Sequence, residues 1–231
     1  MSSTECLPTD ERLAGVLQRL YRTRFSAAEI ATMHRVWRVL VRDFFQKRIR
    51  PDSTVLDVGA GPCLLINEVR ARRRIALDAN PDLAIHAGPG VETVVSADLS
   101  LDEIPDESVD HVFLSNFLEH LPNYRTILDL LARVRRKLSP EGTVLVLQPN
   151  FRLAPAHYFD FIDHSMILTE VSLREALVAA GFEIQEMKVR FLPLTSKSRI
   201  PKWPWLVALY VRLPPAQWLF GKQTFVVAAK R

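Results

Sequence analysis

The chain has 231 residues, of which 48% are hydrophobic and 24% charged. This length and composition suit one α/β domain with a substantial core and exclude a largely disordered chain. The formal net charge is only +4, which a solvated basic surface explains as well as a nucleic-acid partner does.

Cys6 and Cys63 are the two cysteines, and their wide separation predicts neither a disulfide framework nor a metal site. The N-terminus lacks a signal-peptide pattern, and no apolar run approaches the ~20 residues that span a bilayer. The expected location is therefore the reducing cytoplasm.

The N-terminal part predicts two helices, at 10–22 and 26–48. Apolar residues recur at helical spacing in the second one. Ser26 and Glu29 stand at the spacing of a capping box, which marks its start. We expect residues 1–49 to form a helical extension that caps the main domain.

From residue 50 to 231, short apolar strands alternate with helices. This alternation predicts βαβ units, a mostly parallel sheet and helices on both of its faces. Helices are expected at 62–73, shortly after 80, at 124–138 and at 169–180. Strands are expected at 54–58, 74–78, 91–97, 109–115, 143–148, 182–191 and 224–229.

A glycine-rich turn follows the first predicted strand, in the stretch Asp57-Val58-Gly59-Ala60-Gly61. Glycines there let the backbone turn tightly and let a ligand approach the main chain. The edge formed by the carboxyl ends of parallel strands is where such folds bind ligands. A dinucleotide-binding fingerprint would have a third glycine where Leu64 stands, which counts against a nucleotide-dependent oxidoreductase.

The stretch VLDVGAGPC resembles motif I of class I methyltransferases that use S-adenosylmethionine (SAM). The later segments LDANP, SADL, VDHVFLSNFLEHLP and LTEVSLREALVAAGFEI are similar to that family in order and spacing. The resemblance covers about residues 50–191 and the final strand. It implies a Rossmann-like, seven-stranded, mostly parallel sheet, SAM as cofactor and S-adenosylhomocysteine (SAH) as product.

The resemblance also assigns cofactor-binding residues. Asp78 follows the second strand, where the family binds the ribose hydroxyls of SAM, and Asp98 and Leu99 lie where the family contacts the adenine. A helix cap is the alternative interpretation of Asp57 and Asp78. The residues expected to bind the cofactor are Asp57, Gly59, Gly61, Cys63, Asp78, Ala79, Asp98, Leu99, Ser115, Asn116 and Phe117.

Methyl transfer is an in-line displacement, which needs an aligned acceptor and, for a hydroxyl or a protonated amine, a base. His120 follows the fourth strand, although it could simply pack the loop there. The segment 157–164 falls where the family builds its acceptor pocket, although it could be an ordinary lid. The candidate catalytic residues are His120, Tyr158 and His164.

A metal site is conceivable in this segment, because His157, Asp160 and His164 are spaced to share a helix face. We predict no metal site, because a loop leads into the segment and no further ligand is obvious.

The segment 192–221 is an insertion before the last strand, and three of the four tryptophans lie in it. Residues 203–220 could pack on the sheet edge, cover the acceptor, form a dimer surface or rest on a membrane. The proline pair and Arg212 exclude a membrane-spanning helix.

The leading functional hypothesis is transfer of a methyl group to oxygen or nitrogen of a small molecule. A sugar, glycan or natural-product intermediate is suggested by analogy alone. One alternative is a non-catalytic, regulatory SAM-binding partner. Another is a nucleic-acid methyltransferase, but families that methylate base amino groups have Asn/Asp-Pro-Pro-aromatic where Ser115-Asn116-Phe117-Leu118 stands. No nucleic-acid partner is therefore expected.

Overall fold

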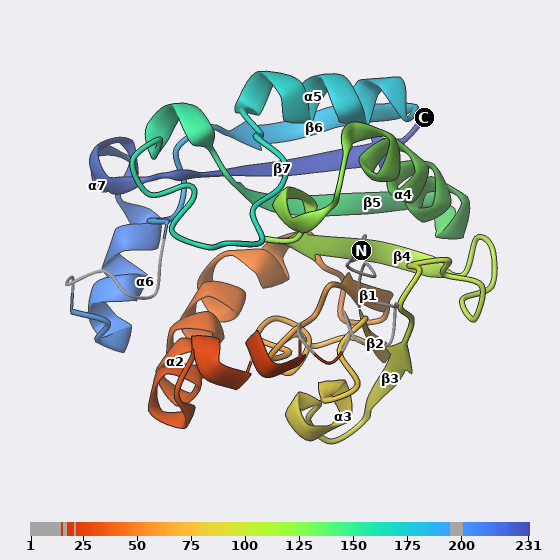
Figure 1. Ribbon diagram of the computed structural model, residues 1–231, viewed down its shortest axis with the longest axis horizontal. Coiled ribbons are helices and arrows are strands. Elements are labelled where there is room, and N and C mark those ends of the chain that lie inside the picture. Colours follow the sequence, from red (N-terminus) through yellow and green to blue (C-terminus); the bar gives the residue numbers. More distant parts are fainter. Residues whose placement is uncertain (1–14, 16–17, 21, 195–200) are drawn as a thin grey trace, which may run out of the picture.

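The computed structural model describes residues 15, 18–20, 22–194 and 201–231. Its described part contains a seven-stranded sheet in the order β3-β2-β1-β4-β5-β7-β6, with helices on both faces (Figure 1). Only β7 runs against its neighbours β5 and β6, which confirms the mostly parallel, Rossmann-like α/β fold. The strands are β1 Thr54–Val58, β2 Arg73–Asp78, β3 Val91–Val95, β4 Val109–Ser115, β5 Leu138–Pro149, β6 Phe182–Lys188 and β7 Gln223–Lys230.

The helices and 3-10 turns follow the strands nearly as predicted. They are α2 Ala27–Asp43, η1 Phe45–Arg48, α3 Leu83–His86, η2 Leu118–His120, α4 Tyr124–Lys137, η3 Phe151–Leu153, α5 Glu170–Ala179, α6 Pro204–Arg212 and α7 Pro214–Phe220. No helix of the described residues is long and apolar enough to cross a membrane.

Each face of the sheet has its own hydrophobic core, because successive side chains of a strand point to opposite faces. Leu56 and Val58 of β1 pack with α4 and α5 on one face. Val55, between them, packs on the other face with α2, η1, α6 and the segment after the glycine turn. Figure 1 shows these two helical layers above and below the sheet.

The N-terminal region contributes to the second core through α2. The predicted capping box is confirmed: the Glu29 N–H is donated to Ser26 Oγ at 3.3 Å, and the Ser26 N–H to Glu29 Oε2 at 2.8 Å. The α-helix ends at Asp43 rather than at residue 48, and a 3-10 turn continues it. Most of the helix predicted at 10–22 lies outside the described residues, and the described ones among these are helical.

The predicted helix at 62–73 is wrong, because the structure has turns over 61–68. Cys63 has a left-handed φ of 55°, which a right-handed helix cannot contain. The turns that follow mix hydrogen bonds across three residues, from the Glu68 N–H to the Leu65 carbonyl, with bonds across four residues.

The fifth strand begins earlier than predicted, directly after α4. Leu138 pairs with Val109, and Thr143 pairs with His111, so the intervening segment 139–142 forms an irregular stretch of β5. The Pro and Gly of this segment mark a bulge within the strand rather than a separate turn.

Candidate functional site

The glycine turn lies at the carboxyl edge of the sheet, between β1 and the segment after it. The N–H groups of Gly59 and Ala60 both donate to the Leu77 carbonyl, at 2.8 and 3.1 Å. Gly59 and Gly61 have φ angles of 70° and 47°, a region that favours glycine. A Cβ on Gly59 would lie 2.2 Å from the ring of Phe117, so this position has no room for a side chain.

Asp78 ties the end of β2 to this turn. One carboxylate oxygen accepts from the Gly61 N–H and the other from the Asn80 N–H, both at 2.8 Å. Burial raises the pKa of this carboxyl, whereas backbone N–H groups including that of Ala79 oppose the increase. The predicted ribose-binding residue therefore also shapes the turn beside it.

Asp57 is buried at the end of β1, under the glycine turn. Burial and the negative charge of Asp78 raise the pKa of Asp57 to about 8. A positively charged ligand beside this carboxyl would stabilise its ionised form. Cys63 is fully buried, and burial raises the pKa of its thiol to about 12, so it contributes packing and turn geometry rather than a nucleophile.

Asp98 and Leu99 follow β3 at the same edge. Asp98 is exposed, and one of its oxygens accepts from Ser96 Oγ at 2.9 Å and from the Ser100 N–H at 3.0 Å. Leu99 has a φ of 54°. The carbonyls of both residues accept from the Arg133 guanidinium, at 3.2 and 3.0 Å, so α4 holds this loop.

Ser115, Asn116 and Phe117 leave β4 next to the glycine turn. The Asn116 amide donates to Ser115 Oγ at 3.1 Å, and its backbone turns at a φ of 48°. The Phe117 ring lies against Gly59. The structure thus brings the residues predicted after β1, β2, β3 and β4 to one edge of the sheet.

His120 lies close enough to this edge for its positive charge to lower the pKa of Asp78. His120 Nδ1 is 3.2 Å from the Asp163 carbonyl oxygen and 3.1 Å from Asp163 Oδ2. Arg24 donates to the other Asp163 oxygen at 2.7 Å. Burial lowers the pKa of His120, but Asp163 and the charge of Glu119 outweigh burial and raise it.

Asp163 itself is partly buried, which alone would raise its pKa. His120 and Arg24 outweigh this effect and hold the pKa of Asp163 well below its usual range. His164 lies against His120 with ring centroids 4.9 Å apart. Burial and the charge of His120 lower the pKa of His164 to about 4, so His164 is neutral near pH 7.

Glu119 is a site residue that the sequence analysis did not single out. It is fully buried, and burial raises the pKa of its carboxyl. Its Oε2 accepts from Gln148 at 3.0 Å, while its Oε1 lies 4.0 Å from His120 Nε2 and 3.9 Å from His164 Nε2. The acidic residue directly before His120 was the signal in the sequence, but nothing local shows that it points inward.

The surroundings of the Tyr158 hydroxyl do not suit a proton acceptor. The buried hydroxyl donates to the Met166 carbonyl at 2.8 Å and accepts from the Leu168 N–H at 3.1 Å. Burial raises its pKa to about 12. These contacts fix the segment before α5 and argue against a role in proton transfer. His157 and Asp160 form an exposed pair at 3.1 Å, apart from the buried His164.

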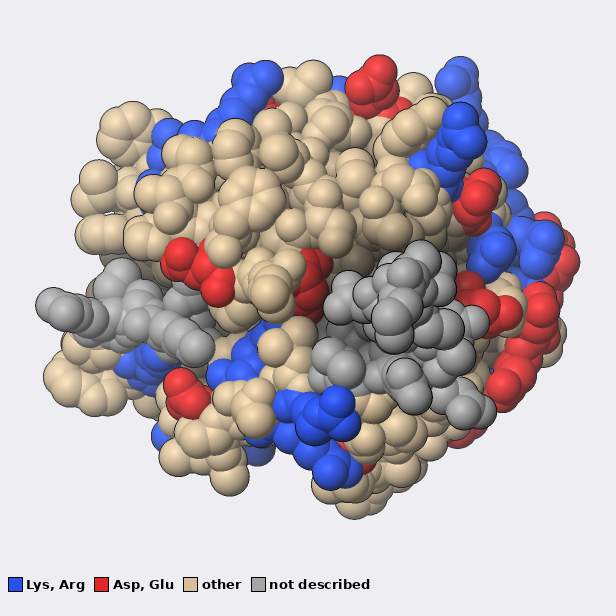
Figure 2. Space-filling view, viewed as in Figure 1, with Lys and Arg blue, Asp and Glu red and all other residues tan. Residues whose placement is uncertain are grey.

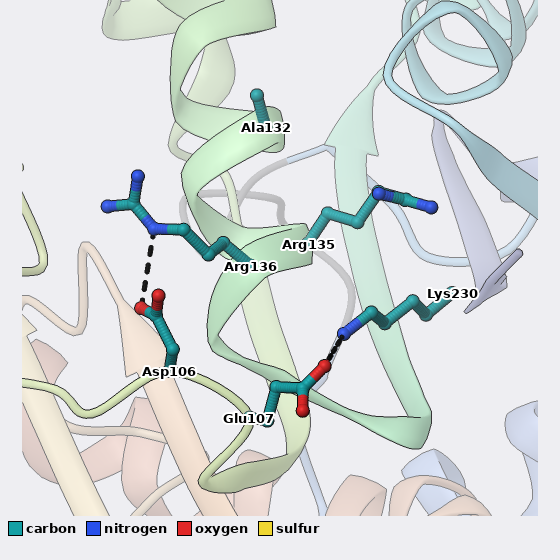
Figure 3. A pocket seen from close by; sticks show the side chains of 6 residues that line it. All are labelled: Asp106, Glu107, Ala132, Arg135, Arg136 and Lys230. Carbon is teal, nitrogen blue, oxygen red and sulfur yellow. Dashed lines mark hydrogen bonds and ion pairs between the residues drawn. The ribbon is translucent and has the colours of Figure 1, made fainter.

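A hollow of about 570 Å³ lies at the opposite edge of the sheet, where β4 begins and β7 ends (Figure 3). Ion pairs at 3.3 Å, between Arg136 and Asp106, and at 2.8 Å, between Lys230 and Glu107, occupy its wall. It is therefore distinct from the edge that carries the glycine turn. Its lining residues are Asp106, Glu107, Ala132, Arg135, Arg136 and Lys230.

The strand order, the glycine turn and the acidic residues at successive strand ends define an α/β protein with a ligand site at the carboxyl edge. The family model described as "Methyltransferase domain" matches residues 30–187. The chain therefore belongs to the methyltransferase domain family. No curated protein matches the chain in sequence.

Solved structures agree with this assignment. A SAM-dependent methyltransferase from Archaeoglobus fulgidus is 19% identical, with 94% of this chain and 99% of that chain covered and a TM-score of 0.63. A Haloferax volcanii methyltransferase, solved with the Trm112 methyltransferase activator, is 17% identical over 92% and 96% of the two chains, with a TM-score of 0.64.

The 1,6-didemethyltoxoflavin-N1-methyltransferase of Burkholderia thailandensis, solved with 1,6-didemethyltoxoflavin and SAH, is a third similar structure. It is 20% identical over 97% of this chain and 92% of that chain, with a TM-score of 0.55. At these identities the likeness establishes the fold, which is that of SAM-dependent methyltransferases.

Proposed function

We propose that this protein transfers the methyl group of SAM to an oxygen or nitrogen of a small molecule, with SAH as the product. The observation that carries the proposal is the glycine turn, clamped by Asp78 at the carboxyl edge of a methyltransferase fold. Ribose hydroxyls would bind Asp78, and the positively charged end of SAM would lie near Asp57.

The reaction needs one bond to form as another breaks. A lone pair of the acceptor attacks the methyl carbon, the carbon–sulfur bond breaks, and its electron pair returns to sulfur. The acceptor loses a proton, which a neighbouring base takes. His120 is our candidate for this base. Its Nδ1 contacts Asp163, so Nε2 is the atom that faces Glu119 and His164.

The acceptor class is proposed as a small organic molecule, such as a sugar, glycan or natural-product intermediate. The small-molecule acceptor named for the Burkholderia thailandensis relative supports this class. Phe159 and Ile162 are exposed on the segment before α5, and they offer apolar surface beside His164 for an organic acceptor.

We propose that α6 and α7 form a peripheral contact with an anionic membrane surface. Trp203, Trp205 and Trp218 are 56%, 61% and 68% exposed, and the part of Figure 2 over α7 is largely uncharged. Tryptophan favours the membrane interface. The Arg190 guanidinium lies over the Trp218 ring at 5.7 Å and supplies positive charge, which would attract anionic headgroups.

This surface is tested by co-sedimentation with vesicles of phosphatidylcholine alone and of phosphatidylcholine with phosphatidylserine. We expect binding only to the anionic vesicles, and loss of binding in W205A/W218A. Tyr124→Ala, which removes another exposed aromatic side chain, is the matched control. Failure of wild type to sediment with either vesicle, or its dimerisation through the tryptophans in light scattering, would overturn the proposal.

The proposed reaction is tested by calorimetry with SAM and SAH, followed by transfer of labelled methyl groups to a panel of phenols, sugars and amines. We expect wild type to bind both ligands in the micromolar range, about −8 kcal/mol. Asp78→Ala should weaken binding by more than ~1 kcal/mol, whereas Asp102→Ala, at an exposed turn, should not. A folded protein that binds neither ligand refutes the cofactor, and binding without transfer to any acceptor favours a regulatory SAM-binding protein.

A further inference from the structure

The cluster of Glu119, His120 and His164 offers three ligand atoms within 4.8 Å of one another. Two of them are imidazole nitrogens that lie 4.0 and 3.9 Å from the same carboxylate oxygen. Ligand atoms that share a tetrahedral Zn²⁺ lie roughly 3.3–3.6 Å apart, since each bond is about 2.0–2.2 Å long. Small side-chain movements would therefore bring all three atoms within bonding distance of one ion.

Glu119 Oε1 supplies an independent reason to expect a cation. This atom belongs to a fully buried side chain, and it has no hydrogen-bond partner among the described residues. The other oxygen, Oε2, is already bound by Gln148. A buried, unpartnered carboxylate oxygen is costly unless a positive charge or a proton meets it.

The surroundings of His120 match those of a metal-binding imidazole. Ligating histidines usually donate their second ring N–H to a carboxylate or a carbonyl oxygen, which fixes the ring. His120 Nδ1 is hydrogen-bonded to the Asp163 carbonyl oxygen at 3.2 Å, and the carboxylate atom Asp163 Oδ2 lies 3.1 Å from Nδ1 as a charge contact without a hydrogen bond. Asp163 is held in turn by Arg24 at 2.7 Å, so Nε2 is presented to the cluster by a chain of contacts.

The cluster is also assembled by long-range contacts. The carbonyl of Glu119 accepts from the N–H groups of Ser165 and Met166, at 2.8 and 3.0 Å. These bonds place His164 beside the 3-10 turn that follows β4. His164 is buried and its Nδ1 has no hydrogen-bond partner among the described residues.

We propose that Glu119 Oε1, His120 Nε2 and His164 Nε2 bind one divalent transition-metal ion at the acceptor side of the site. Two imidazoles and one carboxylate suit Zn²⁺, Mn²⁺ or Fe²⁺ and do not suit Ca²⁺, which prefers oxygen ligands. Three protein ligands leave coordination positions open, as catalytic metal sites do.

The proposal rests on the proposed methyl transfer and changes the role of His120 in it, from proton acceptor to ligand. An acceptor hydroxyl at the open position would lose its proton to solvent more readily, because a bound cation stabilises the oxyanion. Solvent then replaces His120 as the proton acceptor. The metal site therefore narrows the acceptor to molecules with a hydroxyl group that can reach the ion.

The test uses the full chain after treatment with a chelator. Zn²⁺ and Mn²⁺ are added separately, and binding is measured by calorimetry and by elemental analysis after gel filtration. We expect one ion per chain and a higher midpoint of thermal unfolding with the ion, since it binds the folded state. Glu119→Gln and His164→Gln should each weaken binding at least tenfold.

Two further variants distinguish a specific metal site from adventitious binding. Asp163→Asn should weaken metal binding by roughly 10–100-fold through His120. His157→Gln, at an exposed histidine of the same segment, should bind as wild type does. Glu119→Gln keeps the size of the side chain, and its midpoint of thermal unfolding without metal is measured beside that of wild type, so that loss of metal binding is separated from unfolding.

Wild type that binds neither ion, or binding that both Glu119→Gln and His164→Gln leave intact, overturns the metal site. SAM binding is measured in parallel on the same samples. If no ion binds while SAM binds and methyl transfer proceeds, the metal site is refuted and the proposed function stands. If an ion binds but methyl transfer is equally fast without it, the proposed action of the ion on the acceptor is refuted. If the ion binds at Glu119 and SAM does not bind, the proposed function fails and the metal site stands alone.

Discussion

The buried carboxyl of Asp57 predicts that SAM binding is coupled to the release of a proton. Its pKa is raised to about 8, by burial and by the charge of Asp78. At pH 7 such a group is about 90% protonated in the ligand-free protein. A ligand that carries positive charge beside Asp57 favours the ionised form, so binding should release close to one proton per SAM.

The sign and size of the effect follow from this linkage. Because SAM prefers the ionised carboxylate, affinity should increase as the pH increases toward 8 and level off above it. Between pH 6 and 7, the increase approaches tenfold, or about 1.4 kcal/mol. Asp57→Asn cannot ionise, so it should bind SAM more weakly at pH 8 and lose this part of the pH dependence.

The assay is calorimetry of SAM binding at pH 6, 7 and 8, in buffers of different ionisation enthalpy, which counts the protons released. Asp102→Asn, at an exposed turn, is the control and should behave as wild type. A wild-type affinity that stays constant across this range, or equal proton release in Asp57→Asn, refutes the coupling.

Three further changes test the glycine turn and two places elsewhere in the fold. Gly59→Ala should lower SAM affinity at least tenfold in calorimetry. The left-handed φ costs an alanine about 1–2 kcal/mol, and the added Cβ would collide with the Phe117 ring. An unchanged affinity would contradict this prediction. Burial lowers the pKa of His111 to about 4. The folded protein therefore keeps His111 neutral, and about 2–3 kcal/mol of the free energy of unfolding is lost as the pH falls from 6.5 toward 4. In urea unfolding, His111→Asn should show a smaller loss over the same pH range. Arg48→Ala removes two 2.7 Å bonds to Glu186 and should cost about 1–3 kcal/mol in urea unfolding. The control Arg35→Ala, at an exposed residue of α2, should change little.

Much of the fold follows from local sequence patterns. The run at 54–58 is apolar apart from Thr54 and Asp57, and it forms a strand buried at every residue, as expected for a strand covered on both faces. Ser26 and Glu29 begin α2 where their spacing predicts. The expected position of the glycine turn and Asp78 also follows from the sequence, because parallel strands have their carboxyl ends at one edge of the sheet.

Tertiary structure decided the rest of the candidate site. Glu119 and His164 are brought within 3.9 Å by backbone bonds between segments far apart in sequence, and no local periodicity encodes such a pairing. The 62–73 segment has helical periodicity, yet Cys63 adopts a left-handed conformation. The sequence offers Tyr158 as a candidate base, but its hydroxyl is hydrogen-bonded to the backbone of Met166 and Leu168. Local pattern thus determined the strands, their order along the chain and the edge at which cofactor binding is expected. Packing determined which polar side chains are buried together, because burial and hydrogen-bond partners depend on the whole fold.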